Sequence, residues 1–410
     1  MSDNVATLDI TAMAAGGDGV GRTEGMVVFV PRTAVGDVAH VRVTPAKRFG
    51  RGTLLSLDRA SADRVEPACP HYVIDRCGGC QLQHLSYEAQ LRAKRTIIGD
   101  AVRRIGRRDM ADPEVIPSES PWRYRRKLTL HLRWTGKAWI AGLHPFDDAV
   151  AVFDLQDCPI TDERVLEVWR TLRPLFPLLP HERALRASVR IVDAVVAVIV
   201  EGGTRWPGSG EFFRQAPAIT ELWWKPEHGR ARPVASRQTT GAGGAFVQVN
   251  AEVAARLRDD VLARVHAHEG RRVIDAYAGS GATAIPLARD GRTVVAIEWD
   301  HVAVETMSAQ LRSPSHAIAG RVEDHLAEEL PADVVLLNPP RTGVDQRVAA
   351  ALQSAARAPG LVIYVSCDPA TLARDLARMP RYQLVQMRAY DMFPQTAHVE
   401  TVCELVPEAA

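Results

Sequence analysis

Strand-like and helix-like patterns of apolar residues alternate over the last third of the chain. Short apolar runs end in polar or turn-forming residues at 271–279, 293–300, 333–340 and 361–369, and a stretch with helical spacing follows each run. This alternation is typical of a parallel, doubly wound sheet whose faces are covered by helices. We therefore expect an α/β domain over residues 245–410.

The first 58 residues have a different pattern. Two short apolar runs, MVVFV and DVAHVRV, are separated by glycine-rich turns and by Pro31. Such runs predict a small β-barrel over residues 1–58. An OB-like barrel of this kind can grip RNA, but a barrel that only supports its neighbours would have the same pattern. The sequence leaves both interpretations open.

Residues 59–244 combine helical and strand patterns, so we expect a central α+β domain. Ser86 can cap an amphipathic, basic helix that runs to about Ile105. In the segment WRYRRKLTLHLRW, residues 122–134, leucines alternate with polar residues as in a half-buried strand. Its cations could hold RNA phosphates and its aromatic rings could stack on unpaired bases, although a merely solvated basic strand end is an equally good interpretation.

Composition narrows the class of protein. A chain of 410 residues allows two or three domains, and 46% hydrophobic with 24% charged residues is ordinary for a globular protein. The formal net charge is only +1, so a nucleic-acid partner would need a local basic surface. The start of the chain lacks a basic segment followed by a long apolar run, and no stretch approaches a membrane span. We expect a cytoplasmic protein without membrane association.

The segment VIDAYAGSGATA predicts a nucleotide-type binding loop. The chain turns through Gly279 and Gly281 from a strand into a helix, which lets the backbone approach a ligand closely. Glu298 ends the next strand, where a carboxylate can accept both hydroxyls of a ribose. Together these features predict that the loop binds an adenosine-type ligand. Gly279, Gly281 and Ala284 also satisfy the loose dinucleotide pattern, so a nicotinamide oxidoreductase or a simple tight turn remain alternatives for this segment alone.

Six cysteines in a chain of this kind argue for metal or catalytic chemistry and against a disulfide framework. Cys367 follows a predicted strand and directly precedes a helix start, where exposure and the helix dipole favour a reactive thiolate. An inert buried cysteine is the alternative. Cys403 lies in an apolar run and is expected in the core. The remaining four look like one group and are Cys69, Cys77, Cys80 and Cys158.

Five motifs together resemble one known family. In chain order they are FVQVN, DAYAGSG, NPPRTG, YVSCDPATLARDL and FPQTAHVETV, at the approximate spacing of the S-adenosylmethionine-dependent RNA uracil-5-methyltransferases. The resemblance extends over nearly the whole chain, and five motifs are far more specific than one. It implies an OB-like TRAM barrel at 1–58, a central domain with a cysteine cluster at 59–244, and a Rossmann-like catalytic domain at 245–410.

The resemblance assigns the chemistry to Cys367 and Glu400. Carbon 5 of uracil is too weak a nucleophile to accept a methyl group unaided, and addition of the Cys367 thiolate to carbon 6 would activate it. Glu400 matches the family's general base and would remove the carbon 5 proton, so that Cys367 is eliminated. Without the flanking motif, a solvated strand carboxylate would be the simpler interpretation of Glu400.

The resemblance also implies the methyl-donor site. Gln248, Tyr277, Glu298 and Asn338 match the family's S-adenosylmethionine positions, and Phe246 falls near the target base. The family usually has aspartate where Asn338 stands, so a hydrogen-bond acceptor is kept while a negative charge beside the sulfonium is lost. We expect weaker donor binding with activity retained.

The four grouped cysteines resemble the [4Fe-4S] ligands of the family's 23S ribosomal RNA branch, which the transfer-RNA branch generally lacks. Thiolates suit iron–sulfur clusters. The gap between Cys69 and Cys77 is about two residues longer than usual, but a loop insertion of that size need not move the ligands. A Cys₄ zinc site and the absence of any metal remain alternatives.

The expected function is methylation of a uridine in 23S ribosomal RNA by a monomer that flips the target base out of the RNA. A transfer-RNA uracil-5-methyltransferase is the main alternative. A catalytically silent RNA-binding assembly factor is disfavoured because Cys367 and Glu400 are both present. The nicotinamide oxidoreductase gives no reason for NPPRTG or for the position of Cys367.

Overall fold

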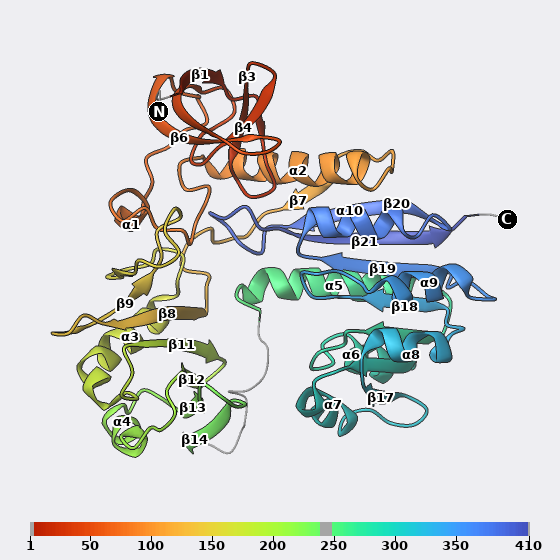
Figure 1. Ribbon diagram of the computed structural model, residues 1–410. Coiled ribbons are helices and arrows are strands. Elements are labelled where there is room, and N and C mark those ends of the chain that lie inside the picture. Colours follow the sequence, from red (N-terminus) through yellow and green to blue (C-terminus); the bar gives the residue numbers. More distant parts are fainter. Residues whose placement is uncertain (1–3, 238–247, 409–410) are drawn as a thin grey trace.

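The computed structural model describes residues 4–237 and 248–408, which are built around three sheets (Figure 1). A six-stranded sheet forms the N-terminal part, a seven-stranded sheet the middle and an eight-stranded sheet the C-terminal part. Within these described ranges, no helix is long and apolar enough to cross a membrane.

The N-terminal sheet curls around a small apolar core, as the sequence predicts for a barrel. Its strands, in the order in which they pair, are β1 (Val5–Asp9), β5 (Val38–Pro45), β6 (Gly50–Arg59), β4 (Met26–Val30), β3 (Gly19–Thr23) and β2 (Ala12–Met13). Gly52 lies inside the curl, where a Cβ atom would come within 2.5 Å of the Val41 side chain. Glycine is therefore required at this position to let the strands approach.

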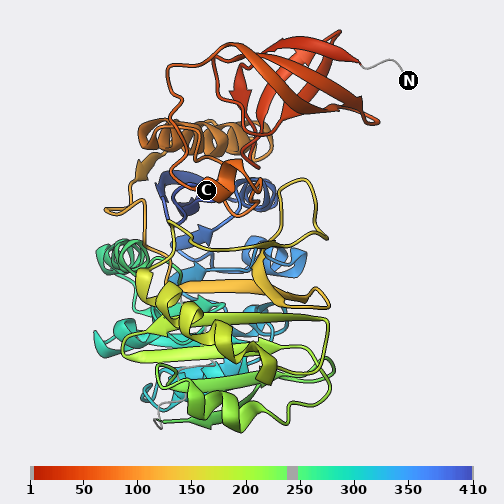
Figure 2. The ribbon, with the colours of Figure 1, turned by 90° about the vertical axis from the view of Figure 1, so that its left-hand side faces the viewer.

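The middle sheet is antiparallel except at one pair. Its strands in pairing order are β10 (Phe153–Asp154), β9 (Trp139–Leu143), β8 (Lys127–Trp134), β11 (Ala184–Val192), β12 (Val195–Glu201), β13 (Glu221–Lys225) and β14 (Arg232–Ser236). Strands β12 and β13 are parallel, and the connection between them contains α4 (Ser209–Gln215). The apolar face of α3 (Glu163–Leu172) packs on the same core. Figure 2 shows this sheet, in yellow and green, below the red barrel.

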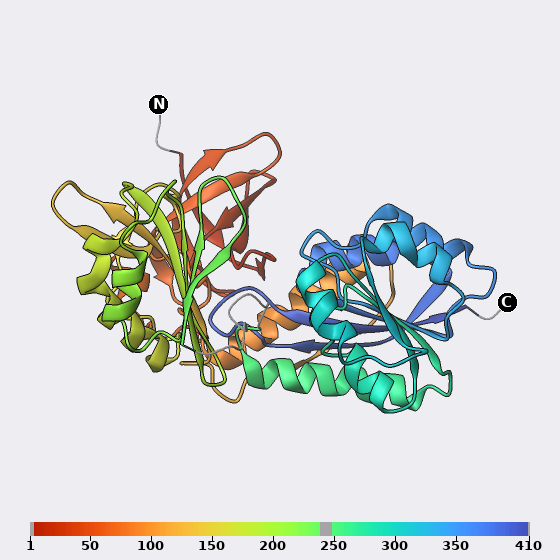
Figure 3. The ribbon, with the colours of Figure 1, turned by 90° about the horizontal axis from the view of Figure 1, so that it is seen from below.

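The C-terminal sheet confirms the predicted parallel, doubly wound arrangement over five of its strands. In pairing order its strands are β17 (His316–Ala319), β16 (Thr293–Glu298), β15 (Arg272–Ala276), β18 (Val334–Leu337), β19 (Leu361–Ser366), β21 (Glu400–Pro407), β20 (Tyr382–Tyr390) and β7 (Glu114–Ile116). The first five are parallel, whereas β21 runs antiparallel to both β19 and β20. Helices cover both faces (Figure 3).

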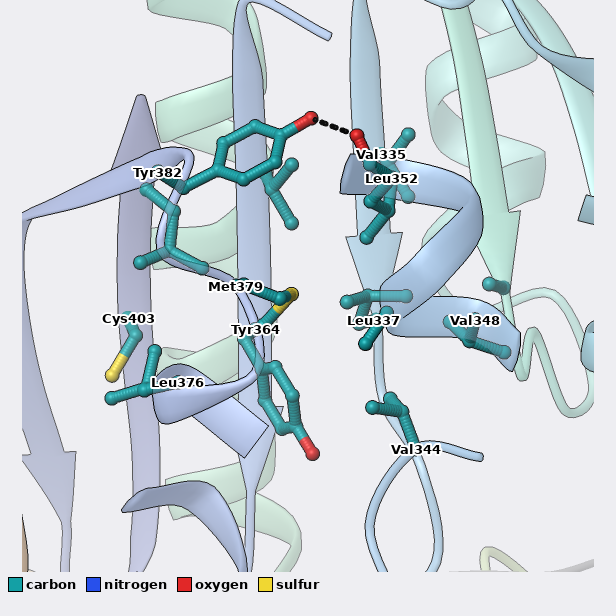
Figure 4. Close-up of a cluster of buried hydrophobic side chains, with 14 of the residues drawn as sticks. Val335, Leu337, Val344, Val348, Leu352, Tyr364, Leu376, Met379, Tyr382 and Cys403 are labelled. Carbon is teal, nitrogen blue, oxygen red and sulfur yellow. Dashed lines mark hydrogen bonds between the residues drawn. The ribbon is translucent and has the colours of Figure 1, made fainter. Parts of the chain in front are cut away.

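The helices of this part follow the strands in the expected alternation. They are α5 (Ala251–Ala267), α6 (Ala284–Arg289), α7 (His301–Ser308), α8 (Val322–Glu329), α9 (Gln346–Ser354) and α10 (Pro369–Ala377). Figure 4 shows how α9, α10 and the sheet interdigitate around Tyr364 and Tyr382, whose hydroxyl donates to the Leu352 carbonyl oxygen at 3.2 Å. Cys403 is fully buried in this core, as predicted.

The long helix α2 (Tyr87–Arg104) packs with the C-terminal sheet, although its sequence lies inside the region expected to form the central domain. Ser86 caps it as predicted, because its hydroxyl accepts the Ala89 N–H at 3.3 Å. The buried residues Ile98 and Val102 join the core of the C-terminal sheet. Strand β7 then pairs in parallel with β20. The blue sheet and the red barrel thus lie on opposite sides of α2 (Figure 1).

Candidate active site

Cys367 and Glu400 lie opposite each other at one edge of the C-terminal sheet. Ser366, the last residue of β19, pairs with Thr401 of β21 in antiparallel register. The next pair along the two strands is therefore Cys367 and Glu400. Cys367 also directly precedes α10, whose N-cap Asp368 accepts a main-chain N–H at 2.7 Å. The fold brings the two residues expected to act as nucleophile and base into one site.

The electrostatic surroundings of this pair oppose ionisation. Burial raises the pKa of Glu400 to about 7, and the guanidinium of Arg341 works against this shift. Burial, followed by the Glu400 carboxylate, raises the pKa of Cys367, while Arg341 again lowers it. The sequence predicted a thiolate favoured by exposure and by a helix dipole. The structure differs because Cys367 is only partly exposed and faces an acidic group, and both features disfavour the thiolate.

Arg341 comes from the NPPRTG loop after β18, and α10 holds this loop in place. Asp375 of α10 is fully buried and accepts the Val344 N–H at 3.0 Å and the Tyr364 hydroxyl at 2.8 Å. The Thr371 hydroxyl donates to the Arg341 carbonyl oxygen at 3.2 Å. Sequence reasoning did not single out Arg341 or Asp375. Their only signal was their place inside two of the recognised motifs.

The glycine loop after β15 leaves its backbone open to a ligand. Gly279 has a φ of +56°, and no atom lies within 4 Å of the position that a Cβ would take. Its N–H donates to Glu298 Oε2 at 2.9 Å, while Glu298 Oε1 accepts the Asp300 N–H at 2.9 Å. Burial raises the pKa of Asp275 to about 6, and the Thr283 hydroxyl donates to it. An open backbone beside an oriented carboxylate fits the ribose of an adenosine-type cofactor.

Two other expected donor-site residues, Tyr277 and Asn338, directly follow β15 and β18 at the same edge of the sheet. Asn338 is exposed at the end of β18, and its N–H donates to the Ala276 carbonyl oxygen at 3.3 Å. Tyr277 has a left-handed backbone with φ of +65°, and its partly buried ring packs against the core. Gln248 is partly buried just before α5. Phe246, expected near the target base, lies outside the described residues.

Three segments of the chain match models of known protein families or domains. Residues 315–406 match the family model of tRNA (Uracil-5-)-methyltransferases, residues 4–55 match the TRAM domain, and residues 240–359 match the methyltransferase small domain. An uncharacterized RNA methyltransferase of Protochlamydia amoebophila is 30% identical over 97% of this chain and 96% of its own length. One from Thermosynechococcus vestitus is 31% identical over 97% of each chain. The chain belongs to the RNA uracil-5-methyltransferase family.

As a member of this family, the protein is an S-adenosylmethionine-dependent RNA methyltransferase with an N-terminal TRAM domain. The crystal structure of the Pyrococcus abyssi tRNA (uracil-54, C5)-methyltransferase in complex with S-adenosyl-L-homocysteine has the same fold. It aligns over 99% of this chain and 100% of its own with a TM-score of 0.72 and 23% sequence identity. The family segment 315–406 contains Asn338, Cys367 and Glu400.

The four grouped cysteines of the methyltransferase lie between residues 55 and 240, outside the three matched segments. Cys69 precedes α1 (Pro70–Val73), and Cys77 and Cys80 follow it in one loop. Cys158 raises the pKa of each of these three thiols, after the larger effect of burial. In the described part of the chain, no three His, Cys, Asp or Glu side chains are arranged around a single metal-ion position. The expected [4Fe-4S] cluster and the 23S ribosomal RNA branch stay predictions.

Proposed function

We propose that this methyltransferase transfers a methyl group to carbon 5 of a uridine in 23S ribosomal RNA through a covalent adduct between Cys367 and carbon 6. The observation that carries the proposal is the pairing of Cys367 with Glu400 across β19 and β21. The glycine loop that fits the cofactor opens at the carboxyl ends of the same parallel strands, where ligands of such sheets bind. Nucleophile, base and methyl donor would therefore meet at one edge.

The first steps belong to Cys367. After the partly exposed thiol loses its proton to solvent water, its sulfur adds to carbon 6 of the uracil and makes carbon 5 enolate-like. Arg341 favours this step, because its positive charge lowers the pKa of the thiol. S-adenosylmethionine supplies the methyl group and leaves as S-adenosylhomocysteine. Carbon 5 then carries both the new methyl group and its original proton.

The last steps belong to Glu400. Its carboxylate removes the proton from carbon 5, the double bond between carbons 5 and 6 re-forms, and the bond from Cys367 to carbon 6 breaks. A pKa raised to about 7 suits a base that must gain and lose a proton near neutral pH. Glu298, Tyr277, Gln248 and Asn338 would hold the methyl donor, and the neutral Asn338 would weaken its binding without abolishing activity.

Trapping of the adduct tests these roles. We expect Glu400→Gln to accumulate a denaturation-resistant protein–RNA species that carries labelled methyl, because methyl transfer proceeds while elimination stalls. Loss of the carboxylate charge also lowers the pKa of Cys367, so adduct formation is not slowed. Cys367→Ala should form no adduct and transfer no methyl group, while its S-adenosylmethionine affinity stays within about threefold of the wild type.

A matched control lies on the same strand. Glu404 of β21 is paired with Arg264, away from the nucleophile, and Glu404→Gln should turn over like the wild type. If Glu400→Gln turns over normally, or makes no labelled adduct with RNA that the wild type methylates, Glu400 is not the base. If Cys367→Ala keeps substantial activity, the covalent mechanism is wrong.

We also propose that Cys69, Cys77, Cys80 and Cys158 hold a [4Fe-4S] cluster. All four are free of disulfide bonds, and Cys69, Cys80 and Cys158 pack in one small cluster with Tyr72 and Tyr124. Four thiolates are the donor set that iron–sulfur clusters take. Burial raises the pKa of all four thiols, and the nearby Arg125 and Arg32 work against this shift at Cys158 and Cys77.

Analysis of protein purified without oxygen tests the cluster. We expect iron and acid-labile sulfide in about equal amounts with a visible absorption band, both lost in Cys80→Ser. Cys403→Ala removes a buried cysteine remote from this group and should retain both. Stoichiometric zinc without sulfide would assign a Cys₄ zinc site instead, and the absence of both metals would remove the proposal.

The RNA target is the remaining part of the proposal. The family model is described by a transfer-RNA activity and the Pyrococcus abyssi enzyme acts on tRNA, so a tRNA target is the specific alternative. Mapping 5-methyluridine in both RNAs from a deletion strain decides between them. We further propose that the protein is a monomer, which light scattering tests. We also propose that the chain forms three units, 1–58, 59–244 and 245–410, and that α2 and β7 of the second unit pack on the third.

A further inference from the structure

The segment 391–399, which leads from β20 to Glu400, has no regular structure but is held firmly by its surroundings. Asp391 is fully buried, and Gln395 is only 3% exposed. Gln395 also has a φ of +70°, a left-handed conformation that costs a non-glycine residue about 1 kcal/mol or more. Such a conformation persists only where neighbouring contacts enforce it.

Helix α2 supplies the first set of these contacts. Gln90 is 1% exposed, and its side chain binds Gln395 twice: Oε1 accepts the Gln395 N–H at 2.9 Å and Nε2 donates to the Gln395 side-chain oxygen at 2.9 Å. Nε2 also donates to the Leu85 carbonyl oxygen at 3.0 Å. One helical turn later, Lys94 forms a fully buried ion pair with Asp391 and donates to the Phe393 carbonyl oxygen at 3.1 Å.

The loop that carries Cys77 and Cys80 supplies the second set. The N–H groups of Gln81 and Leu82 both donate to the Gln395 carbonyl oxygen, at 3.2 Å and 3.0 Å. The Tyr124 hydroxyl donates to the Pro394 carbonyl oxygen at 3.0 Å. Gln395 is thus bound through its N–H, its carbonyl and its side chain by two segments more than three hundred residues away in sequence.

We propose that Gln90 is a positioning residue for Glu400, and that α2 and the cysteine loop together hold the base through Gln395. The proposal rests on the proposed role of Glu400 as the base. Only four residues separate Gln395 from Glu400, so displacement of Gln395 displaces the start of β21. Displacement of a reacting group by about 1 Å can slow its step a hundredfold.

Gln90→Met tests the proposal, because methionine keeps the length of the side chain and removes its hydrogen bonds. We expect free methylated RNA to be released at least tenfold more slowly while protein-linked methylated RNA forms within threefold of the wild-type rate. Loosening the segment also admits water to Glu400 and lowers its raised pKa, so the acid limb of release should move to lower pH. Hydrogen exchange over 391–399 should rise in the free protein.

The matched control is Gln353→Met on α9. The Gln353 side-chain oxygen likewise accepts a main-chain N–H, from Arg381 at 3.2 Å, but remote from Glu400. Gln353→Met should leave the rate at which methylated RNA is released unchanged, together with the fall of that rate at low pH. Should Gln90→Met fail to fold, Gln395→Asn replaces it, because asparagine tolerates the left-handed backbone but its side-chain oxygen is too short to reach Gln90 Nε2.

Two results overturn the proposal. One is wild-type release and wild-type exchange over 391–399 in a folded Gln90→Met or Gln395→Asn protein. The other is an equal loss of S-adenosylmethionine affinity, adduct formation and release, which indicates general destabilisation. Failure of Glu400→Gln to form the adduct removes the proposed base instead, and the exchange result distinguishes the two failures because it is measured without RNA.

Discussion

A carboxylate beside a thiol makes the thiolate harder to form, whereas a guanidinium makes it easier. Cys367 has both neighbours. Glu400 raises its pKa, Arg341 lowers it, and burial has the largest effect. The same Arg341 lowers the pKa of Glu400, so the cation links the ionisation of nucleophile and base. Charge changes at these two neighbours should therefore shift the first chemical step in opposite directions.

The first prediction at this scale concerns the pH dependence of adduct formation. Because the reactive species is the thiolate, formation should rise with pH and level off above the pKa of Cys367. Glu400→Gln removes a negative charge and should move this rise to lower pH, and Arg341→Met removes a positive charge and should move it to higher pH. Single-turnover rapid quench with labelled methyl donor, from about pH 6 to about pH 11, measures both shifts, because the pKa of Cys367 lies above that of an ordinary thiol.

Glu404→Gln serves as the control, because it changes a carboxylate of the same strand that does not face Cys367. Its profile should coincide with that of the wild type. Shifts of Glu400→Gln and Arg341→Met in the same direction would contradict the opposing roles assigned to their charges.

The proposed nucleophile and base could be singled out from the sequence, but their ionisation could not. Cys367 and Glu400 each lie in a motif that is short and local, so the chain alone pointed to them. Their pKa values depend on burial and on Arg341, which a different loop brings close. Burial is a property of the folded chain, so the sequence suggested an exposed Cys367, whereas the fold partly buries it and raises the pKa of its thiol.

At the scale of elements, the Asp375 carboxylate of α10 helps to hold the NPPRTG loop against that helix. Asp375 accepts the Val344 N–H and the Tyr364 hydroxyl, and it also forms ion pairs with Arg374 at 2.8 Å and Arg378 at 3.2 Å. Gly343 allows this approach, since a Cβ there would lie 2.2 Å from an Asp375 oxygen and its φ is +77°. The loop that presents Arg341 therefore depends on the helix that follows Cys367.

Asp375→Asn should lower the free energy of unfolding by about 2 kcal/mol, because an amide nitrogen would face a main-chain N–H and the buried charge would be lost. The matched control is Asp345→Asn at the N-cap of α9, where asparagine caps as well as aspartate and the loss should stay below about 0.5 kcal/mol. Urea unfolding of the two variants measures the difference. Equal stability would show that other contacts hold the loop.

The alternation of strands and helices after residue 270 predicted the parallel strands because each has a continuous apolar run. Two features of the same sheet were not predictable. Strand β7 has only three residues, too few for a pattern, and it joins the sheet from a distant part of the chain. The antiparallel direction of β21 follows from its hairpin with β20, whose long connection contains the buried residues of the FPQTAHV motif.

At the scale of the whole molecule, the cysteine loop lies between the barrel and the segment that leads to Glu400. On one side it donates two N–H groups to Gln395. On the other side the barrel inserts Arg32, which donates to the carbonyl oxygens of Tyr72 and Cys77, the latter at 3.1 Å. The Arg32 guanidinium also lies over the rings of Tyr72 and Phe146, 4.0 Å and 4.4 Å from their centres. The barrel therefore stabilises the loop that in turn binds the segment leading to Glu400.

Arg32→Met should loosen this loop without unfolding the barrel, because methionine keeps an apolar stem over the aromatic rings but loses the charge and the donors. Charge-assisted hydrogen bonds contribute about 2 kcal/mol, so local opening should become roughly thirtyfold more frequent. Hydrogen exchange should report it at the Cys77 and Gly78 amides, whose N–H groups donate to the His71 and His144 carbonyl oxygens, while the Val41 amide inside the barrel keeps its protection. The exposed barrel residue Arg48 offers the control Arg48→Met, which should change none of these amides. Unchanged exchange at Cys77 and Gly78 in Arg32→Met would mean that the barrel contact does not stabilise the cysteine loop. If exchange rises at Cys77, Gly78 and Val41 together, the substitution disturbs the barrel itself.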